Sequence, residues 1–193
     1  MTQIKIRFES FEEYLSYDND TENLYELFNG ELVEVPPESG KNSNIAVFLF
    51  MQFVSKFSCR LVKGHDLGLE VRGEPRNRYP DLTILREEHI AQLQQRNTIR
   101  LSMAPPLLVI EIVSPGDLQR DRDYIAKRMQ YQDRGIPEYW IVDPQLDMIL
   151  KLELIDDVFI EAATFRASDR ICSQVAAFNL TAAEIFAASK LGE

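Results

Sequence analysis

The chain has 193 residues, of which 45% are apolar, and a formal net charge of −10 at pH 7. This length and apolar content are enough for one sizeable hydrophobic core, and no change of composition indicates a second domain, so we expect a single domain over residues 1–193. The net acidity argues against a protein that holds nucleic acid mainly by bulk attraction to phosphates.

The sequence lacks the features of membrane-spanning and disulfide-rich secreted proteins. Its longest apolar run, residues 45–54, has about ten residues, whereas a membrane-spanning helix needs roughly 20. The N-terminus has no apolar signal segment, so we expect a cytoplasmic protein with no membrane partner. The chain has two cysteines and two histidines. A zinc site or a disulfide framework is therefore not expected, and any metal would need oxygen ligands.

The first third of the chain predicts a helix, a hairpin and a longer helix. Ser10 and Glu13 have the spacing of a capping box. Asn29 and Gly30 separate two strand-like runs and are typical of a type I′ turn. Apolar residues at helical spacing then indicate a helix with one buried face. In chain order, the expected elements are a helix at 11–17, strands at 23–28 and 31–35, and a helix at 44–57.

The rest of the chain alternates strands and helices. Apolar runs bounded by Gly and Pro are typical of strands. A polar segment that ends at Gly135 and Pro137 has the stop signals of a helix, and Thr181 with Glu184 forms a second capping-box pattern. The expected strands are 59–64, 67–72, 79–85, 107–113, 138–143, 148–155 and 158–165, and the expected helices are 87–95, 120–134 and 182–189.

These elements together predict an α/β fold. Residues 107–143 read as a strand, a helix and a second strand, which is the pattern of a βαβ crossover. The strands at 148–155 and 158–165 form a hairpin. We therefore expect a central mixed β-sheet flanked by helices, with an N-terminal hairpin and a C-terminal hairpin plus helix.

Two carboxylates interrupt apolar strands: Asp81 in "YPDLTIL" and Glu111 in "LLVIEIV". A buried carboxylate needs a cationic partner, a metal or a raised pKa. Two acids on adjacent strands repel unless a cation lies between them, and Mg²⁺ accepts such hard oxygen ligands. Alternatively, each acid pairs with an arginine such as Arg78 or Arg100, or lies on a solvent-facing side of its strand. Sequence patterns alone leave both interpretations open.

Four ordered motifs resemble a known family. They are Pro80-Asp81, Glu111 with Ser114-Pro115, Lys127 followed by Tyr131, and "GIPEYWIVDP". The resemblance is to the Uma-two family of restriction endonucleases, in the PD-(D/E)xK nuclease superfamily, and it covers most of the chain. It implies a restriction endonuclease-like core of a helix, three strands, a helix and a strand, with metal-binding acids on the second and third strands.

The resemblance implies a metal-dependent nuclease that hydrolyses DNA phosphodiester bonds. Asp81 and Glu111, with the backbone carbonyl of Ile112, would bind Mg²⁺ or Mn²⁺. The superfamily lysine usually lies two residues after the second acid, where this chain has Val113, and Lys127 on the next helix matches a relocated lysine. A long lysine stem can reach across from a helix packed over the strand. Lys127 also fits a helical ion pair with Asp123.

Other positions bear on activity. Glu26 matches a recurrent acid of the family and Glu70 is similar, although either also fits an exposed carboxylate. Asn42 stands where the family usually carries a histidine. This departure, the Val113 departure and the net acidity favour the alternative of a catalytically inactive scaffold that binds nucleic acid or protein. A homodimer would suit the cutting of two strands.

Overall fold

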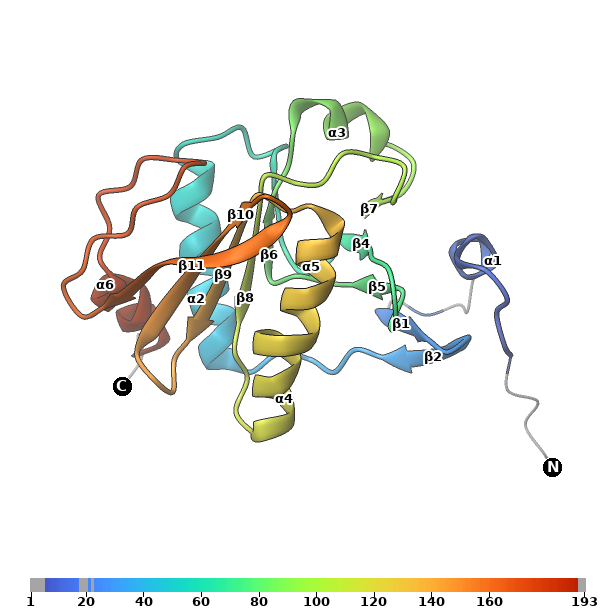
Figure 1. Ribbon diagram of the computed structural model, residues 1–193, viewed down its shortest axis with the longest axis horizontal. Coiled ribbons are helices and arrows are strands. Elements are labelled where there is room, and N and C mark those ends of the chain that lie inside the picture. Colours follow the sequence, from blue (N-terminus) through green and yellow to red (C-terminus); the bar gives the residue numbers. More distant parts are fainter. Residues whose placement is uncertain (1–5, 18–20, 22, 191–193) are drawn as a thin grey trace.

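The computed structural model describes residues 6–17, 21 and 23–190. Its centre is a mixed sheet (Figure 1). The sheet has six strands in the order β11-β10-β9-β8-β6-β3. β8 and β9 are parallel, and the other neighbours are antiparallel. The strands are β3 (Val62–Lys63), β6 (Leu82–Ile84), β8 (Leu108–Ile112), β9 (Glu138–Asp143), β10 (Met148–Ile155) and β11 (Val158–Arg166). The expected α/β fold with a central mixed sheet and a C-terminal hairpin is confirmed. The expected domain also includes residues 1–5, 18–20, 22 and 191–193, which lie outside the described residues.

The predicted βαβ crossover joins β8 to β9. Its helical part has three sections: α4 (Asp117–Asp121), the π-helix η1 (Arg122–Lys127) and α5 (Arg128–Arg134). It ends at Gly135, whose φ of 78° is readily adopted only by a residue without a side chain. The prediction of one regular helix over 120–134 was therefore wrong in its start and in its middle. The spacing of apolar residues does not distinguish a single π-turn from an α-turn, so the sequence could not show the π-helix.

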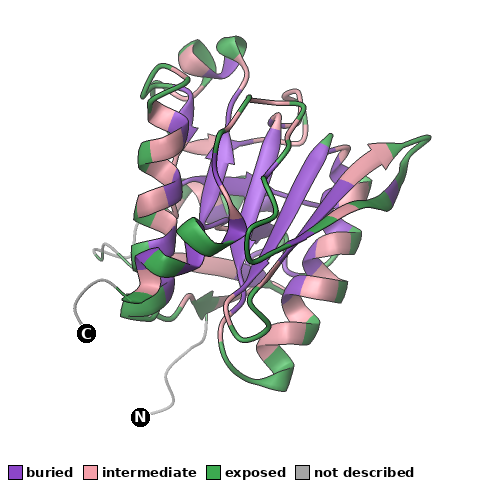
Figure 2. Cartoon of the chain, turned by 90° about the vertical axis from the view of Figure 1, so that its left-hand side faces the viewer, coloured by how far each residue is buried: buried purple, intermediate pink, exposed green. Residues whose placement is uncertain are grey.

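Both faces of the sheet are covered. Successive side chains of a strand point to opposite faces, so Ile110 and Trp140 pack toward α2 (Gly40–Val54), while Val109 and Tyr139 pack toward α5. Figure 2 shows these buried strands between flanking helices. The helix predicted at 44–57 begins and ends earlier than expected, at Gly40 and Val54. Ser39 caps its start by accepting a hydrogen bond from the Asn42 backbone amide.

The C-terminal helix completes the α2 side of the sheet. It runs over α6 (Ala182–Ala187) and continues as the 3-10 helix η2 (Ala188–Lys190). Both bonds of the predicted capping box are present: the Glu184 amide donates to Thr181 Oγ1 at 3.3 Å, and the Thr181 amide donates to Glu184 Oε2 at 2.7 Å.

Smaller elements surround one end of the sheet. The predicted hairpin is β1 (Tyr25–Phe28) and β2 (Glu31–Glu34), with positive φ at Asn29 and Gly30 as a type I′ turn requires. The predicted helices α1 (Phe11–Ser16) and α3 (Glu87–Gln92) are also present. The predicted strand at 67–72 is shorter, and it pairs with two strands that were not predicted. They form the sheet of β4 (Gly68–Glu70), β5 (Asn77–Arg78) and β7 (Thr98–Ile99). Among the described helices, none combines the length and apolar character that crossing a membrane requires.

Candidate active site

The antiparallel pairing of β6 and β8 brings the two predicted acids together. Leu82 pairs with Ile110, so Asp81, the residue before β6, lies opposite Glu111. Side chains opposite each other on one sheet face have Cβ atoms about 5 Å apart. Both residues are buried, with 8% of Asp81 and 1% of Glu111 exposed, and both line one cavity of about 230 Å³. The convergence that the sequence analysis expected is therefore present.

Lys127 reaches the same cavity from η1. Its Nζ lies 2.7 Å from Glu111 Oε2 and 2.8 Å from Asp123 Oδ1. The predicted helical ion pair with Asp123 is therefore present, and the same ammonium group also contacts the strand acid Glu111. Burial alone lowers the pKa of Lys127, but the charges of Glu111 and Asp123 outweigh it, so the pKa of this lysine is raised. Lys127 is therefore an ammonium group, and a hydrogen-bond donor, at neutral pH.

Two buried tyrosines hold this ion-pair network in place. The Tyr131 hydroxyl donates to Glu111 Oε1, and the Tyr139 hydroxyl donates to the backbone carbonyl of Asp123 at 2.9 Å. Burial, with the charge of Glu111 as the next cause, raises the pKa of Tyr131 well above its usual value. Both oxygens of Glu111 therefore accept a hydrogen bond from a protonated donor, which orients the carboxylate.

Asp81 has a different environment. Its Oδ2 accepts a hydrogen bond of 2.7 Å from the Ile112 amide, and its Oδ1 lies 3.6 Å from His65 Nδ1. Burial, followed by the charge of Glu111, raises the pKa of Asp81 from 3.8 to about 8. Without a cation, Asp81 is therefore mostly protonated at neutral pH, and a positive ion at the site would favour its charged form.

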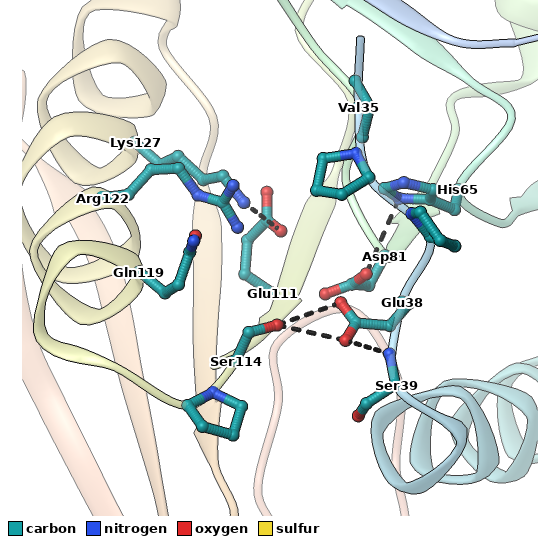
Figure 3. A pocket seen from close by; sticks show the side chains of 13 residues that line it. Val35, Glu38, Ser39, His65, Asp81, Glu111, Ser114, Gln119, Arg122 and Lys127 are labelled. Atoms are coloured by element: carbon teal, nitrogen blue, oxygen red, sulfur yellow. Dashed lines mark hydrogen bonds and ion pairs between the residues drawn. The ribbon is translucent and has the colours of Figure 1, made fainter.

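The cavity has two walls (Figure 3). Gln119, Arg122 and Lys127 project from the crossover helix on one side, and Glu38 and His65 line the other, with Asp81 and Glu111 between them. The Ser114 hydroxyl donates to Glu38 Oε1 at 3.1 Å, which links the end of β8 to the loop before α2.

Asn42 supports this loop from the first turn of α2. Its side-chain amide donates to Glu38 Oε1 at 3.1 Å and to the Ile112 carbonyl at 3.4 Å. It is 2% exposed. Asn42 therefore links the loop before α2 to the backbone at the end of β8.

A comparison with protein families decides the classification. The model of Uma2, described as "Putative restriction endonuclease", matches residues 11–183. The chain belongs to the Uma2 family. The resemblance inferred from the motifs is confirmed.

A solved structure shares the fold of this chain. A crystal structure from Anabaena variabilis ATCC 29413, described as "a putative nuclease belonging to DUF820", superimposes with a TM-score of 0.63 at 17% sequence identity. The match covers 92% of this chain and 97% of that chain. At this identity the likeness shows a shared fold. No curated protein matches the sequence.

The other two acids considered from the sequence, Glu26 and Glu70, lie elsewhere in this Uma2 protein. Glu26 Oε2 lies 3.0 Å from Arg78 Nη1, and Glu70 Oε2 lies 2.8 Å from Arg100 Nε. Neither acid lines the cavity. Arg78 and Arg100, which were considered as partners for Asp81 and Glu111, are therefore engaged by other carboxylates.

Several residues of the site were not predicted. Arg122 is the arginine that lines the cavity, whereas Arg120 pairs with Asp143 at 3.1 Å. Glu38 lies in a loop rich in proline, and His65 follows a glycine at the end of β3. Their positions depend on where these loops lie beside the sheet, which local patterns do not show.

The oxygen atoms at the cavity suit a hard divalent cation in kind, although they are few in number. In the portion of the chain that the structure describes, no three His, Cys, Asp or Glu side chains lie close enough to form a complete metal site. Two buried carboxylates and a backbone carbonyl are nevertheless the oxygen ligands that Mg²⁺ uses, and Mg²⁺ keeps several water ligands of its own. Burial and the charge of Glu111 raise the pKa of Asp81, and a cation bound beside it would lower this pKa again.

Proposed function

We propose that this Uma2 protein is a metal-dependent nuclease that hydrolyses DNA phosphodiester bonds. The observation that carries the proposal is the buried pair Asp81 and Glu111, set opposite each other on neighbouring strands, with the Lys127 ammonium 2.7 Å from Glu111. Paired carboxylates in a cavity are unfavourable without a cation. The family description and the shared fold agree with a nuclease.

Asp81, Glu111 and the carbonyl of Ile112 would hold Mg²⁺ or Mn²⁺. The ion, when bound, would lower the pKa of a water ligand and stabilise negative charge on the phosphoryl oxygens. Asn42 donates to the Ile112 carbonyl and to Glu38, and so helps to position the first turn of α2 beside the ligands.

Lys127 would act as the relocated catalytic lysine. Because its pKa is raised, it is not a base at neutral pH and acts as a donor to the attacking water or to a phosphate oxygen. Glu111 and Asp123 fix its position, and Tyr131 in turn orients Glu111. Arg122 lines the same cavity and would contact a second phosphate oxygen. Val113, at the usual lysine position, is fully buried in the core.

The proposal extends to the assembly and cellular setting. We propose one domain over residues 1–193, because the family match alone spans residues 11–183. We also propose a cytoplasmic protein and a homodimer, in which two sites would cut two strands.

The experiment is cleavage of plasmid and single-stranded DNA by purified protein with Mn²⁺. Asp81→Ala and Glu111→Ala should each abolish cleavage and Mn²⁺ binding. Asp133→Asn is a matched control, because Asp133 is an exposed acid paired with Arg72 outside the cavity. Cleavage that survives both alanine variants would refute the metal site.

The second candidate is a non-catalytic scaffold that binds nucleic acid or protein. The absence of three clustered ligands among the described residues favours it, together with the asparagine at position 42. Wild-type protein that neither cleaves DNA nor binds Mn²⁺ would support the scaffold.

A further inference from the structure

A second cavity adjoins the proposed active site. It has a volume of about 220 Å³ and is lined mainly by Ala46, Val47 and Phe50 of α2 and by Gly64. Glu38, His65 and Asp81 line both cavities. We call the second one the α2 pocket. Val47 is 56% exposed, so an apolar surface lies open to solvent directly beside the proposed metal ligand.

The position of the α2 pocket restricts what it can bind. A phosphodiester held at Asp81 carries a nucleoside on each side, and these must lie on the surfaces next to the cavity. The opposite wall presents Gln119 and Arg122, which suit phosphate oxygens (Figure 3). The apolar, flat part of a nucleotide is its base, and the apolar surface bordering Asp81 is that of Val47 and Phe50.

The charge of the protein supports contact through a base. The net charge is −10, and Lys127 is held by two carboxylates. Attraction to phosphates alone would therefore give weak binding. Aromatic and apolar contacts with an unstacked base provide affinity that does not depend on net charge.

We propose that the α2 pocket binds one unstacked nucleobase next to the scissile phosphate, so that single-stranded or unpaired DNA is the preferred substrate. The inference rests on the proposed nuclease function, because it places the phosphate at Asp81. A base within a duplex is stacked and paired, and it would have to leave the helix to enter this pocket.

The test compares two decamers, oligo-dT and a decamer of abasic tetrahydrofuran residues with the same phosphates. Their binding is measured by fluorescence anisotropy with Ca²⁺, and their cleavage with Mn²⁺. Wild-type protein should bind oligo-dT about tenfold more tightly than the abasic decamer. Phe50→Ala should remove this preference and leave binding of the abasic decamer unchanged. Met51→Ala is the matched control, because Met51 is 65% exposed on the same helix and does not line the pocket.

A second variant fills the pocket and leaves its aromatic residue intact. A Cβ atom at Gly64 would meet only Asp66 Oδ1, at 3.9 Å, so the backbone tolerates a side chain there. Gly64→Leu should cause the same loss for oligo-dT as Phe50→Ala. Equal affinity of wild-type protein for both decamers, or an equal loss for both in the variants, would overturn the inference. Failure to cleave either decamer, with the binding difference intact, would count against the nuclease function and not against the pocket.

Discussion

The strongest prediction concerns how stability depends on pH when Asp81 is replaced by asparagine. In the metal-free protein, burial and the charge of Glu111 raise the pKa of Asp81 from 3.8 to about 8. Between these two pH values the unfolded chain has released the Asp81 proton and the folded chain still holds it. The Asp81 contribution to the free energy of unfolding therefore decreases as pH rises through this window.

The structure sets the size of the effect. When the folded chain binds one proton more than the unfolded chain, the free energy of unfolding falls by about 1.4 kcal/mol per pH unit. From pH 5 to pH 7, wild type should therefore lose about 2 to 3 kcal/mol relative to Asp81→Asn, which cannot ionise. Asparagine has a similar shape, and its side-chain oxygen can still accept the hydrogen bond from the Ile112 amide. In the absence of metal, we expect the variant to be the more stable protein at pH 7.

Urea unfolding in EDTA at pH 5, 6, 7 and 8 measures this difference, with unchanged m-values as the check on two-state behaviour. Asp133→Asn is the control, since Asp133 is exposed and its replacement should leave the wild-type pH dependence intact. Saturating Mn²⁺ should stabilise wild type and leave Asp81→Asn unaffected. If the free energies of unfolding of wild type and Asp81→Asn changed in parallel with pH, the pKa of Asp81 would not be raised in the folded protein.

Three further predictions concern the same network. The affinity for Mn²⁺, measured by calorimetry, should rise about tenfold per pH unit up to about pH 8, because the ion displaces the Asp81 proton; a pH-independent affinity would contradict this. Lys127→Met leaves the buried Glu111 without a cation and leaves Asp123 with Arg122 Nε alone, at 3.5 Å, and should lower the free energy of unfolding by about 3 to 5 kcal/mol. A decrease of less than about 1 kcal/mol in the free energy of unfolding, measured in urea, would show that Lys127 does not stabilise these carboxylates. Tyr131→Phe leaves Glu111 Oε1 without its donor and should cost about 1 to 3 kcal/mol in the same assay and slow Mn²⁺-dependent cleavage. Unchanged stability and cleavage would exclude a positioning role for this hydroxyl.

The sequence by itself determined the local elements of this protein. Asn29 and Gly30 specify the turn of the N-terminal hairpin, and Thr181 with Glu184 specifies the start of α6, because these signals act within a few residues. The apolar run around Glu111 likewise predicted a buried strand. Strands of two residues, such as β5 and β7, were missed because they are too short to show alternation.

The tertiary structure decided which side chains meet. The register of β6 against β8 places Asp81 opposite Glu111, and the π-helix η1 brings Lys127 onto the same carboxylate. The long-range packing of separate segments also assigned Arg78 to Glu26 and not to either of the central acids. Such contacts join residues between 16 and 52 positions apart and depend on strand register and side-chain reach. Local residue patterns carry no information on either, so only the folded chain could show them.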